Sequence, residues 1–188
     1  MSTPQDRVRA AAAAWTPHDD LGRRQRGQVL DWLASTEDIY RRVKPDTPPM
    51  HLVAYFLLVD RAAGQVLLCD HRLAGLWLPT GGHVEPGEDP AHTVRREVRE
   101  ELGVPAAFVD GADLPFFWTV TLTSGHSGPQ HTDVSAWFAL LGEVGMPLEP
   151  DAGEFHGVRW YSRGGVERLR PERRDPHLLR ALDALGLA

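Results

Sequence analysis

The spacing of apolar residues divides the chain into a helical beginning and a strand-rich remainder. Residues 1–44 show helical spacing: an alanine-rich segment comes first, and the next segment has apolar side chains that can share one face, namely Val29, Leu30, Trp32 and Leu33. A further short helical turn is expected over residues 36–42, capped by Ser35 or Asp38. The prolines among residues 44–49 cannot continue a helix, so this segment predicts a boundary.

Beyond this boundary the apolar residues form short runs that predict β-strands. Residues 51–59 are almost continuously apolar, as expected for a strand that is covered on both faces. A turn over residues 60–64 leads to a hairpin partner. That partner and three further strands are expected over residues 65–70, 116–122, 131–141 and 158–162. Strands and helices alternate irregularly, which predicts an α/β fold with a mixed sheet and helices on its faces.

Two further helices carry capping signals at their ends. Asp89 followed by proline is a favourable helix start and Gly103 is a natural stop, so a helix is predicted over residues 90–102. Near the end of the chain, Asp175 precedes another proline, and leucines recur after it at helical spacing. This pattern predicts a closing helix that begins at Pro176.

The bulk composition narrows the class of protein. The 188 residues include 26 acidic and 20 basic side chains, and this net charge of −6 argues against a general nucleic-acid-binding surface. The single cysteine, Cys69, excludes an internal disulfide, suits a reducing compartment and lies in an apolar run typical of a buried strand. Because no stretch reaches the roughly 18 apolar residues of a membrane span, we expect a cytoplasmic protein.

Acidic residues crowd one side of the helix predicted over residues 90–102. Its apolar residues should face the sheet: Ala91, Val94, Val98 and Leu102. Glu97, Glu100 and Glu101 fall beside this stripe, where each like-charged pair costs roughly 0.2–0.5 kcal/mol. Two interpretations account for them. One is a solvated face with ion pairs such as that of Arg96 with Glu100, and the other is a site for a hard cation such as Mg²⁺, which takes oxygen ligands.

The loop before this helix favours the cation site. Gly81 and Gly82 permit backbone conformations in which carbonyl and amide groups point into a site. Glu88 stands just before the helix, where its carboxylate can accept amide hydrogen bonds and hold the loop closed. The spacing of the glycines and the glutamates can therefore identify the kind of site.

This spacing resembles the signature of the Nudix hydrolase family, G-x5-E-x7-R-E-U-x-E-E-x-G-U, in which U is a bulky aliphatic residue. All nine constrained positions match: Gly82, Glu88, Arg96, Glu97, Val98, Glu100, Glu101, Gly103 and Val104. A looser resemblance covers about residues 50–165, and the first 44 residues lie outside it. Thr80 departs from the family, which often has proline before the glycine pair, and we expect only a small change in the loop.

The resemblance implies a Nudix-type α/β/α sandwich with a mixed β-sheet and a loop-helix-loop catalytic box. We therefore expect a Nudix hydrolase domain over residues 50–188, preceded by an N-terminal helical extension and linker over residues 1–49. The family also implies a metal site for Mg²⁺, or Mn²⁺ in its place, formed by three side chains and one backbone carbonyl: Glu97, Glu100, Glu101 and Gly82. In the same scheme Arg96 orients a glutamate from outside the metal's ligand shell.

Acidic residues outside the helix leave the general base open between two candidates. Either Glu97 or Glu154 can serve, because the family often supplies a late acidic residue from the loop before its last strand. An ordinary loop carboxylate is the alternative for Glu154. Glu85 either joins the metal site or is an exposed loop residue.

Two histidines, one tryptophan and one aspartate are candidate substrate contacts: His83, His131, Trp77 and Asp133. His126 is another, although a loop histidine is usually a surface residue. Strand aromatics such as Phe117, Trp118 and Trp137 are more typical of core than of base stacking. No H-x3-H or cysteine spacing supports a histidine-based zinc site.

The resulting hypothesis is a Mg²⁺-dependent pyrophosphohydrolase that cleaves a diphosphate bond in a nucleoside diphosphate linked to another moiety X, or in a nucleoside triphosphate. The alternative is a Nudix-fold sensor that binds a nucleotide or sugar nucleotide without cleaving it. An isoprenoid diphosphate isomerase would need a catalytic cysteine, and Cys69 lies in an apolar strand instead. The identity of X stays open, as does a homodimer contact through the N-terminal helices. No membrane or extended nucleic-acid partner is expected.

Overall fold

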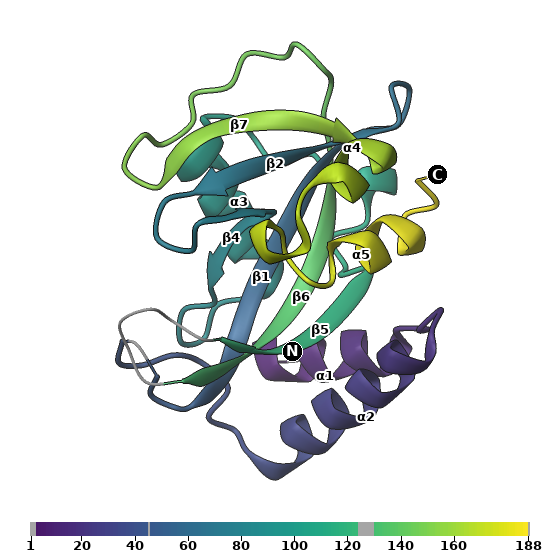
Figure 1. The fold of residues 1–188 in the computed structure, drawn as a ribbon. Helices are drawn as coiled ribbons and strands as arrows, with labels where there is room; N and C mark the ends of the chain where they lie inside the picture. The colour runs from purple at the N-terminus through teal and green to yellow at the C-terminus, as the bar shows by residue number, and fades with distance from the viewer. Residues whose placement is uncertain (1–2, 45, 124–129, 188) are drawn as a thin grey trace.

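A mixed β-sheet forms the centre of the computed structural model, which describes residues 3–44, 46–123 and 130–187 (Figure 1). Its strands within the described residues are β1 (Met50–Asp60), β2 (Gln65–His71), β3 (Leu76–Leu78), β4 (Thr80–His83), β5 (Phe117–Thr123), β6 (His131–Leu141) and β7 (Phe155–Ser162). The helices are α1 (Pro4–Ala14), α2 (Asp20–Ser35), α3 (Pro90–Leu102), α4 (Arg163–Arg168) and α5 (Leu178–Ala184). Two short 3₁₀ turns are η1 (Val109–Gly111) and η2 (Pro171–Arg173). Within the described residues, no helix combines the length and the apolar character needed to cross a bilayer.

Strand β1 lies in the middle of the sheet and pairs with three others. It runs parallel to β6 from Met50, opposite Thr132, to Val59, opposite Leu141. Its other edge pairs antiparallel with β4 and then, for two residues, with β2. The predicted hairpin of β1 and β2 is therefore confirmed at its turn, but the strands diverge and β2 continues along β7 and β3. The sheet is mixed, as predicted.

The predicted acidic helix forms α3 with the predicted ends. Asp89 caps it, because its Oδ1 accepts a hydrogen bond from the Ala91 amide at 2.9 Å. Gly103 ends it in the left-handed conformation, with φ of 72°. The predicted apolar stripe is buried: Ala91, Val94, Val98 and Leu102. One face of α3 is thus fixed against the sheet, and this packing sets where its glutamates lie.

Large aromatic side chains from the strands fill the core. Phe117, Trp118 and Trp137 are fully buried, which confirms the core interpretation of these residues. Cys69 is buried as well, and burial raises the pKa of its thiol. Trp15, just after α1, packs edge-on against Phe117 with ring centroids 5.8 Å apart. The N-terminal helices therefore share the core of the sheet.

The stretch after α2 departs from the prediction. The helix ends at Ser35, and residues 36–44 do not form the expected further helical turn. Instead, Ile39 and Tyr40 are buried in the core, and the Leu52 amide donates a hydrogen bond to the Ile39 carbonyl at 2.8 Å. Tertiary packing against the start of β1 overrides the weak local capping signal.

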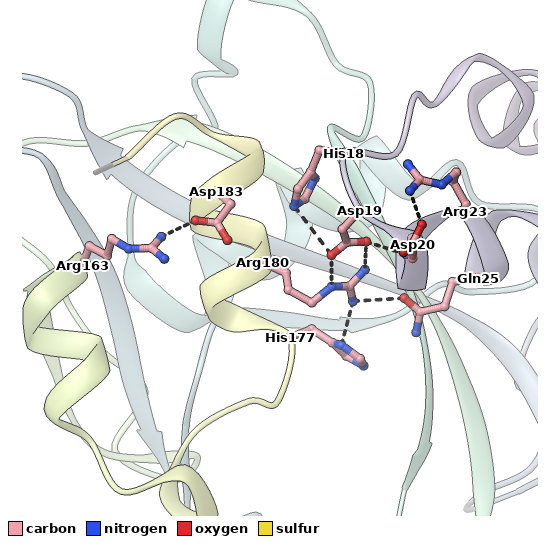
Figure 2. A network of polar contacts seen from close by, with 10 residues as sticks. His18, Asp19, Asp20, Arg23, Gln25, Arg163, His177, Arg180 and Asp183 are labelled. Carbon is pink, nitrogen blue, oxygen red and sulfur yellow. Dashed lines mark hydrogen bonds and ion pairs between the residues drawn. The ribbon is translucent and has the colours of Figure 1, made fainter.

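The C-terminal helix α5 is joined to the start of the N-terminal helix α2 by a polar network (Figure 2). Asp19 caps α2, and Arg180 of α5 donates Nε and Nη2 to its carboxylate at 2.6 and 3.0 Å. The Arg180 Nη1 donates to Gln25 at 3.1 Å. These contacts join segments from opposite ends of the chain.

The end of the chain differs in detail from the prediction. Helix α5 begins at Leu178, two positions later than expected, because Asp175 accepts the His177 amide at 2.7 Å in a turn before the helix. Helix α4 was not predicted. It starts directly after β7, where the Ser162 hydroxyl accepts the Gly165 amide at 3.2 Å.

Candidate functional site

Strand β4 and helix α3 meet through two glycines and two glutamates. A Cβ atom placed on Gly82 would lie 2.1 Å from Oε1 of Glu97, so only glycine leaves room for this carboxylate. The Gly81 amide donates a hydrogen bond to Oε2 of Glu101 at 3.2 Å. The predicted glycine turn is therefore part of β4, and it positions the carboxylates of α3 directly.

Glu101 is the most deeply placed acidic residue of the site. It is 5% exposed, and burial raises the pKa of its carboxyl to about 9. The negative charges of Glu97 and Glu154 contribute to this rise in pKa, and the hydrogen bond from the Gly81 amide opposes it. A carboxyl group in this setting binds either a proton or a cation at neutral pH.

Glu97 lies beside Glu101 and is held by Arg96. Its side chain is 14% exposed, and Nη1 of Arg96 donates to its Oε1 at 2.7 Å. Burial raises the pKa of Glu97, Arg96 lowers it, and the charges of Glu100 and Glu154 raise it again. The positive charge of Arg96 therefore offsets only part of the negative charge of the neighbouring carboxylates.

Arg96 also joins this pair to the preceding loop. Its Nη2 donates to Oε2 of Glu88 at 3.3 Å. Glu88 accepts two further hydrogen bonds, from the Glu85 amide at 3.2 Å and the Thr93 hydroxyl at 2.8 Å. The prediction that Glu88 holds the loop closed is confirmed by these contacts.

The residues present fit a hard divalent cation. Glu97, Glu101 and Glu154 bring their charges together beside Gly82, and carboxylate oxygens are the ligands that Mg²⁺ takes in proteins. Glu100 lies at the margin: its side chain is 60% exposed and accepts from Arg96 at 3.5 Å. Glu85 is exposed, in agreement with the simpler of its two interpretations.

The residues predicted to contact substrate have neighbours other than these carboxylates. Trp77 is half-buried and packs edge-on against Tyr161, with ring centroids 5.3 Å apart. His83, His131 and Asp133 form a separate cluster. His126 lies outside the described residues.

Three histidines surround Asp133 at one end of the sheet. Oδ1 of Asp133 lies 3.3 Å from Nε2 of His51, 3.6 Å from Nε2 of His131 and 3.8 Å from Nε2 of His83. Burial and the positive charge of Arg41 lower the pKa of His83 to about 2. Three members of this cluster, His83, His131 and Asp133, were predicted as substrate contacts, and His51 was not.

The strand register explains how the cluster forms. His51 of β1 pairs with Asp133 of β6, and His83 of β4 pairs with Val53, two residues beyond His51. His131 stands two residues before Asp133. Residues at pairs and at i,i+2 share a face of the sheet, so all four side chains meet. The chain has no H-x3-H or cysteine spacing, and these four residues come from three separate strands, an arrangement that local spacing cannot reveal.

A cavity of about 270 Å³ lies between α1 and the start of α3. Arg7, Asp89, Trp118 and Phe138 are among its lining residues. It contains none of the carboxylates proposed as metal ligands, so the chemistry of α3 is not located there.

The chain resembles Nudix proteins in its sequence. The family model described as "NUDIX domain" matches residues 50–182. "Nudix hydrolase 19, chloroplastic" from Arabidopsis thaliana is 26% identical over 136 residues, which make up 71% of this chain and 29% of that protein. The chain thus spans less than a third of the length of this relative.

Solved structures share the fold. A hydrolase of the NUDIX family from Clostridium perfringens has a TM-score of 0.54 and 24% identity, over 73% of this chain and 97% of that one. The MutT protein from Methanosarcina mazei Go1 has a TM-score of 0.60 and 18% identity, over 78% and 99% of the two chains. Together with the mixed sheet and the N-terminal helices, these likenesses confirm the predicted fold class.

Proposed function

The chain belongs to the Nudix hydrolase family, and on this premise we propose that it hydrolyses a diphosphate bond in a nucleoside diphosphate linked to another moiety X, with Mg²⁺ as its metal. One observation carries the proposal: beside Gly81 and Gly82, the carboxylate of Glu101 is buried close to the negative charges of Glu97 and Glu154, which raise its pKa. Burying like charges together is costly without a cation. A cation shared with the substrate's phosphates offsets the charge of both.

The ligands of this metal follow from the family and from the positions of the residues. Glu97, Glu100, Glu101 and the Gly82 carbonyl would hold Mg²⁺, or Mn²⁺ in its place. When bound, the metal lowers the pKa of water and stabilises negative charge on phosphate oxygens. Glu100 is exposed and already close to Arg96, so it suits an outer position of the site.

The chain's own residues prepare the site before substrate binds. Arg96 fixes the Glu97 carboxylate and joins it to Glu88, so the loop is tied to the helix by hydrogen bonds. The Gly81 amide orients the carboxylate of Glu101. These contacts hold the groups in place and reduce the reorganisation needed during reaction.

We assign the general base to Glu154, on the loop before β7. Glu97 is held by Arg96, whereas among the described residues Glu154 makes no ion pair, and it is exposed. Its charge acts on both Glu97 and Glu101, so it lies close to the acidic site. In this role the Glu154 carboxylate accepts the proton of the water that attacks phosphorus.

Trp77 is retained as a candidate contact for the nucleoside or for X. Trp77 belongs to β3, and only Pro79 separates β3 from β4 along the chain. Trp77 is therefore close in sequence to the glycine pair of β4. An aromatic face can stack on a base. The same ring packs against Tyr161, which fixes its orientation.

A substrate panel tests the proposal. Release of phosphate or nucleoside monophosphate is measured for nucleoside triphosphates, ADP-ribose, dinucleoside polyphosphates and sugar nucleotides, with and without Mg²⁺. The proposal requires cleavage of at least one compound, dependent on Mg²⁺ and lost in Glu101→Gln. Tight binding of one compound without any cleavage would favour the sensor interpretation instead.

A further inference from the structure

The cluster of His51, His83, His131 and Asp133 combines two buried residues, His51 and Asp133, with the half-buried His83 and His131. The side chain of His51 is 0% exposed and that of Asp133 is 9% exposed. Gly82 faces Glu97 of α3, and successive strand residues point to opposite faces, so His83 projects to the other face of the sheet. The two clusters therefore occupy different faces of β4.

Polar atoms inside this cluster have no hydrogen-bond partner among the described residues. They are Nε2 of His51, Nε2 of His83, Nδ1 of His131 and Oδ1 of Asp133. Buried polar atoms are normally satisfied, and each unsatisfied group costs about 1–3 kcal/mol. Such a concentration in one cluster indicates a group that binds among them.

The hydrogen bond on the far side of His51 identifies the atom that is left free. Its Nδ1 donates to the Pro48 carbonyl at 2.8 Å, which directs the lone pair of Nε2 toward Asp133. In the neutral imidazole this leaves Nε2 as an acceptor, 3.3 Å from a carboxylate oxygen that is an acceptor as well. Metal-binding histidines generally donate their other ring N–H in this way.

We propose that His51, His83, His131 and Asp133 form a binding site for a transition-metal dication, with Zn²⁺ the ion that these ligands suit best. Each residue offers one ligand atom, and these atoms lie within 4.8 Å of one another. Tetrahedral zinc with bonds of about 2.0–2.1 Å needs ligand atoms about 3.3–3.4 Å apart. The separations from Asp133 Oδ1 are between 3.3 and 3.8 Å, and the other ligand atoms, which are up to 4.8 Å apart, would move closer together when the ion binds.

The ligand chemistry separates this site from the acidic one. Imidazole suits Zn²⁺ and its neighbours in the transition series, whereas Mg²⁺ takes oxygen ligands. Four protein ligands form a closed site, which is typical of a structural rather than a catalytic zinc. An ion bound here would join β1, β4 and β6, and it would fix the end of the strand that carries Gly81 and Gly82.

Metal content tests this proposal independently of catalysis. The full chain is purified without chelator, and its zinc is measured by mass spectrometry. The chelator-treated protein is then titrated with Co²⁺, whose visible absorption reports tetrahedral nitrogen and oxygen ligands. We expect one zinc per chain, a tetrahedral Co²⁺ spectrum, and a rise in melting temperature when Zn²⁺ is added back.

Three variants locate the ion. His51→Ala and Asp133→Asn should weaken zinc binding at least about 100-fold. Asp133→Asn keeps the shape of the side chain, so it preserves the test if His51→Ala does not fold. His156→Ala removes an exposed histidine of β7 and should keep the zinc.

Two results would overturn the proposal. One is the absence of zinc from the purified protein together with no tetrahedral Co²⁺ spectrum. The other is zinc that persists in Asp133→Asn but is lost in Glu101→Gln, since that would place the ion in the acidic site. Because neither readout depends on turnover, failure here is distinguishable from failure of the proposed hydrolysis.

Discussion

The carboxylate of Glu97 lies against the backbone of Gly82, in the space that a Cβ atom would occupy. That Cβ would come within 2.1 Å of Oε1 and 2.6 Å of Cδ of the glutamate. The contact links the glycine turn to the acidic helix and explains why both are needed at this spacing. It also separates two glycines that stand side by side but have different roles.

Gly82→Ala should impair activity far more than stability. The backbone of Gly82 is in a conformation open to any residue, and the clashing group is the end of a flexible side chain. Glu97 can therefore move aside, and the folding free energy should change by less than about 1 kcal/mol. Displacing this carboxylate should lower turnover about 100-fold. Steady-state kinetics and urea unfolding measure the two effects.

Gly81→Ala is the matched control and should strongly destabilise the fold. Gly81 has φ of 144°, and its added Cβ would lie 2.1 Å from the Ala54 carbonyl oxygen, which belongs to the backbone. Backbone strain and the clash together should cost about 3 kcal/mol or more. Equal stabilities of the two alanine variants would contradict the assignment.

Glu154→Gln tests the assignment of the general base. Loss of a general base typically lowers kcat by about 10²–10⁴-fold, and the glutamine should leave substrate KM nearly unchanged. Glu143→Gln alters an exposed loop carboxylate and is the control. If both variants turn over like the original protein, Glu154 is an ordinary loop residue and the base must be sought at Glu97.

Arg180→Met should loosen the attachment of the N-terminal helices. It removes the paired hydrogen bonds to Asp19 and the contact with Gln25, which are partly buried, so the loss should be about 1–3 kcal/mol in the free energy of unfolding. Arg23→Met breaks an exposed ion pair with Asp20 in the same region and should cost less than about 0.5 kcal/mol (Figure 2). Similar losses in the two variants would argue against a specific role for Arg180.

Asp175 should make stability depend on pH. Burial raises the pKa of its carboxyl from 3.8 to about 6, so the folded protein keeps this proton to a higher pH than the unfolded chain. The stabilisation is therefore complete below about pH 4 and is lost as the pH rises through 6, a change of about 3 kcal/mol. Asp175→Asn still accepts the His177 amide and removes the titration.

Urea unfolding at several pH values compares the two proteins directly. Between about pH 4 and pH 7 the original protein should lose stability relative to Asp175→Asn by this amount. His177, whose pKa burial lowers to about 4, titrates in both proteins and cancels in the difference. Parallel stability curves would show that Asp175 has an ordinary pKa.

Local signals were enough to predict the acidic helix. The cap at Asp89, the stop at Gly103 and the apolar stripe depend on neighbouring residues only, and all three are confirmed. The same reasoning failed after Ser35, where burial of Ile39 and Tyr40 decides the path of the chain. Weak capping signals cannot anticipate packing against a strand that comes later in the sequence.

The histidine cluster depends on information that local patterns do not contain. His51 and Asp133 meet because β1 runs parallel to β6 in one particular register. A shift of one residue would move one of them to the opposite face of the sheet. Glu154 reaches the acidic site in a similar way, from a loop that only the family resemblance connected with it.

Turnover measured against Mg²⁺ concentration tests whether the carboxylates of α3 support Mg²⁺-dependent hydrolysis. The best compound of the substrate panel is used with the original protein, Glu97→Gln, Glu101→Gln and the exposed control Glu143→Gln. We predict saturable dependence on Mg²⁺ in the original protein and the control, and a loss of at least about 100-fold in the two α3 variants. Turnover that persists in Glu97→Gln and Glu101→Gln, or that needs no divalent metal, would show that these carboxylates do not hold a catalytic metal.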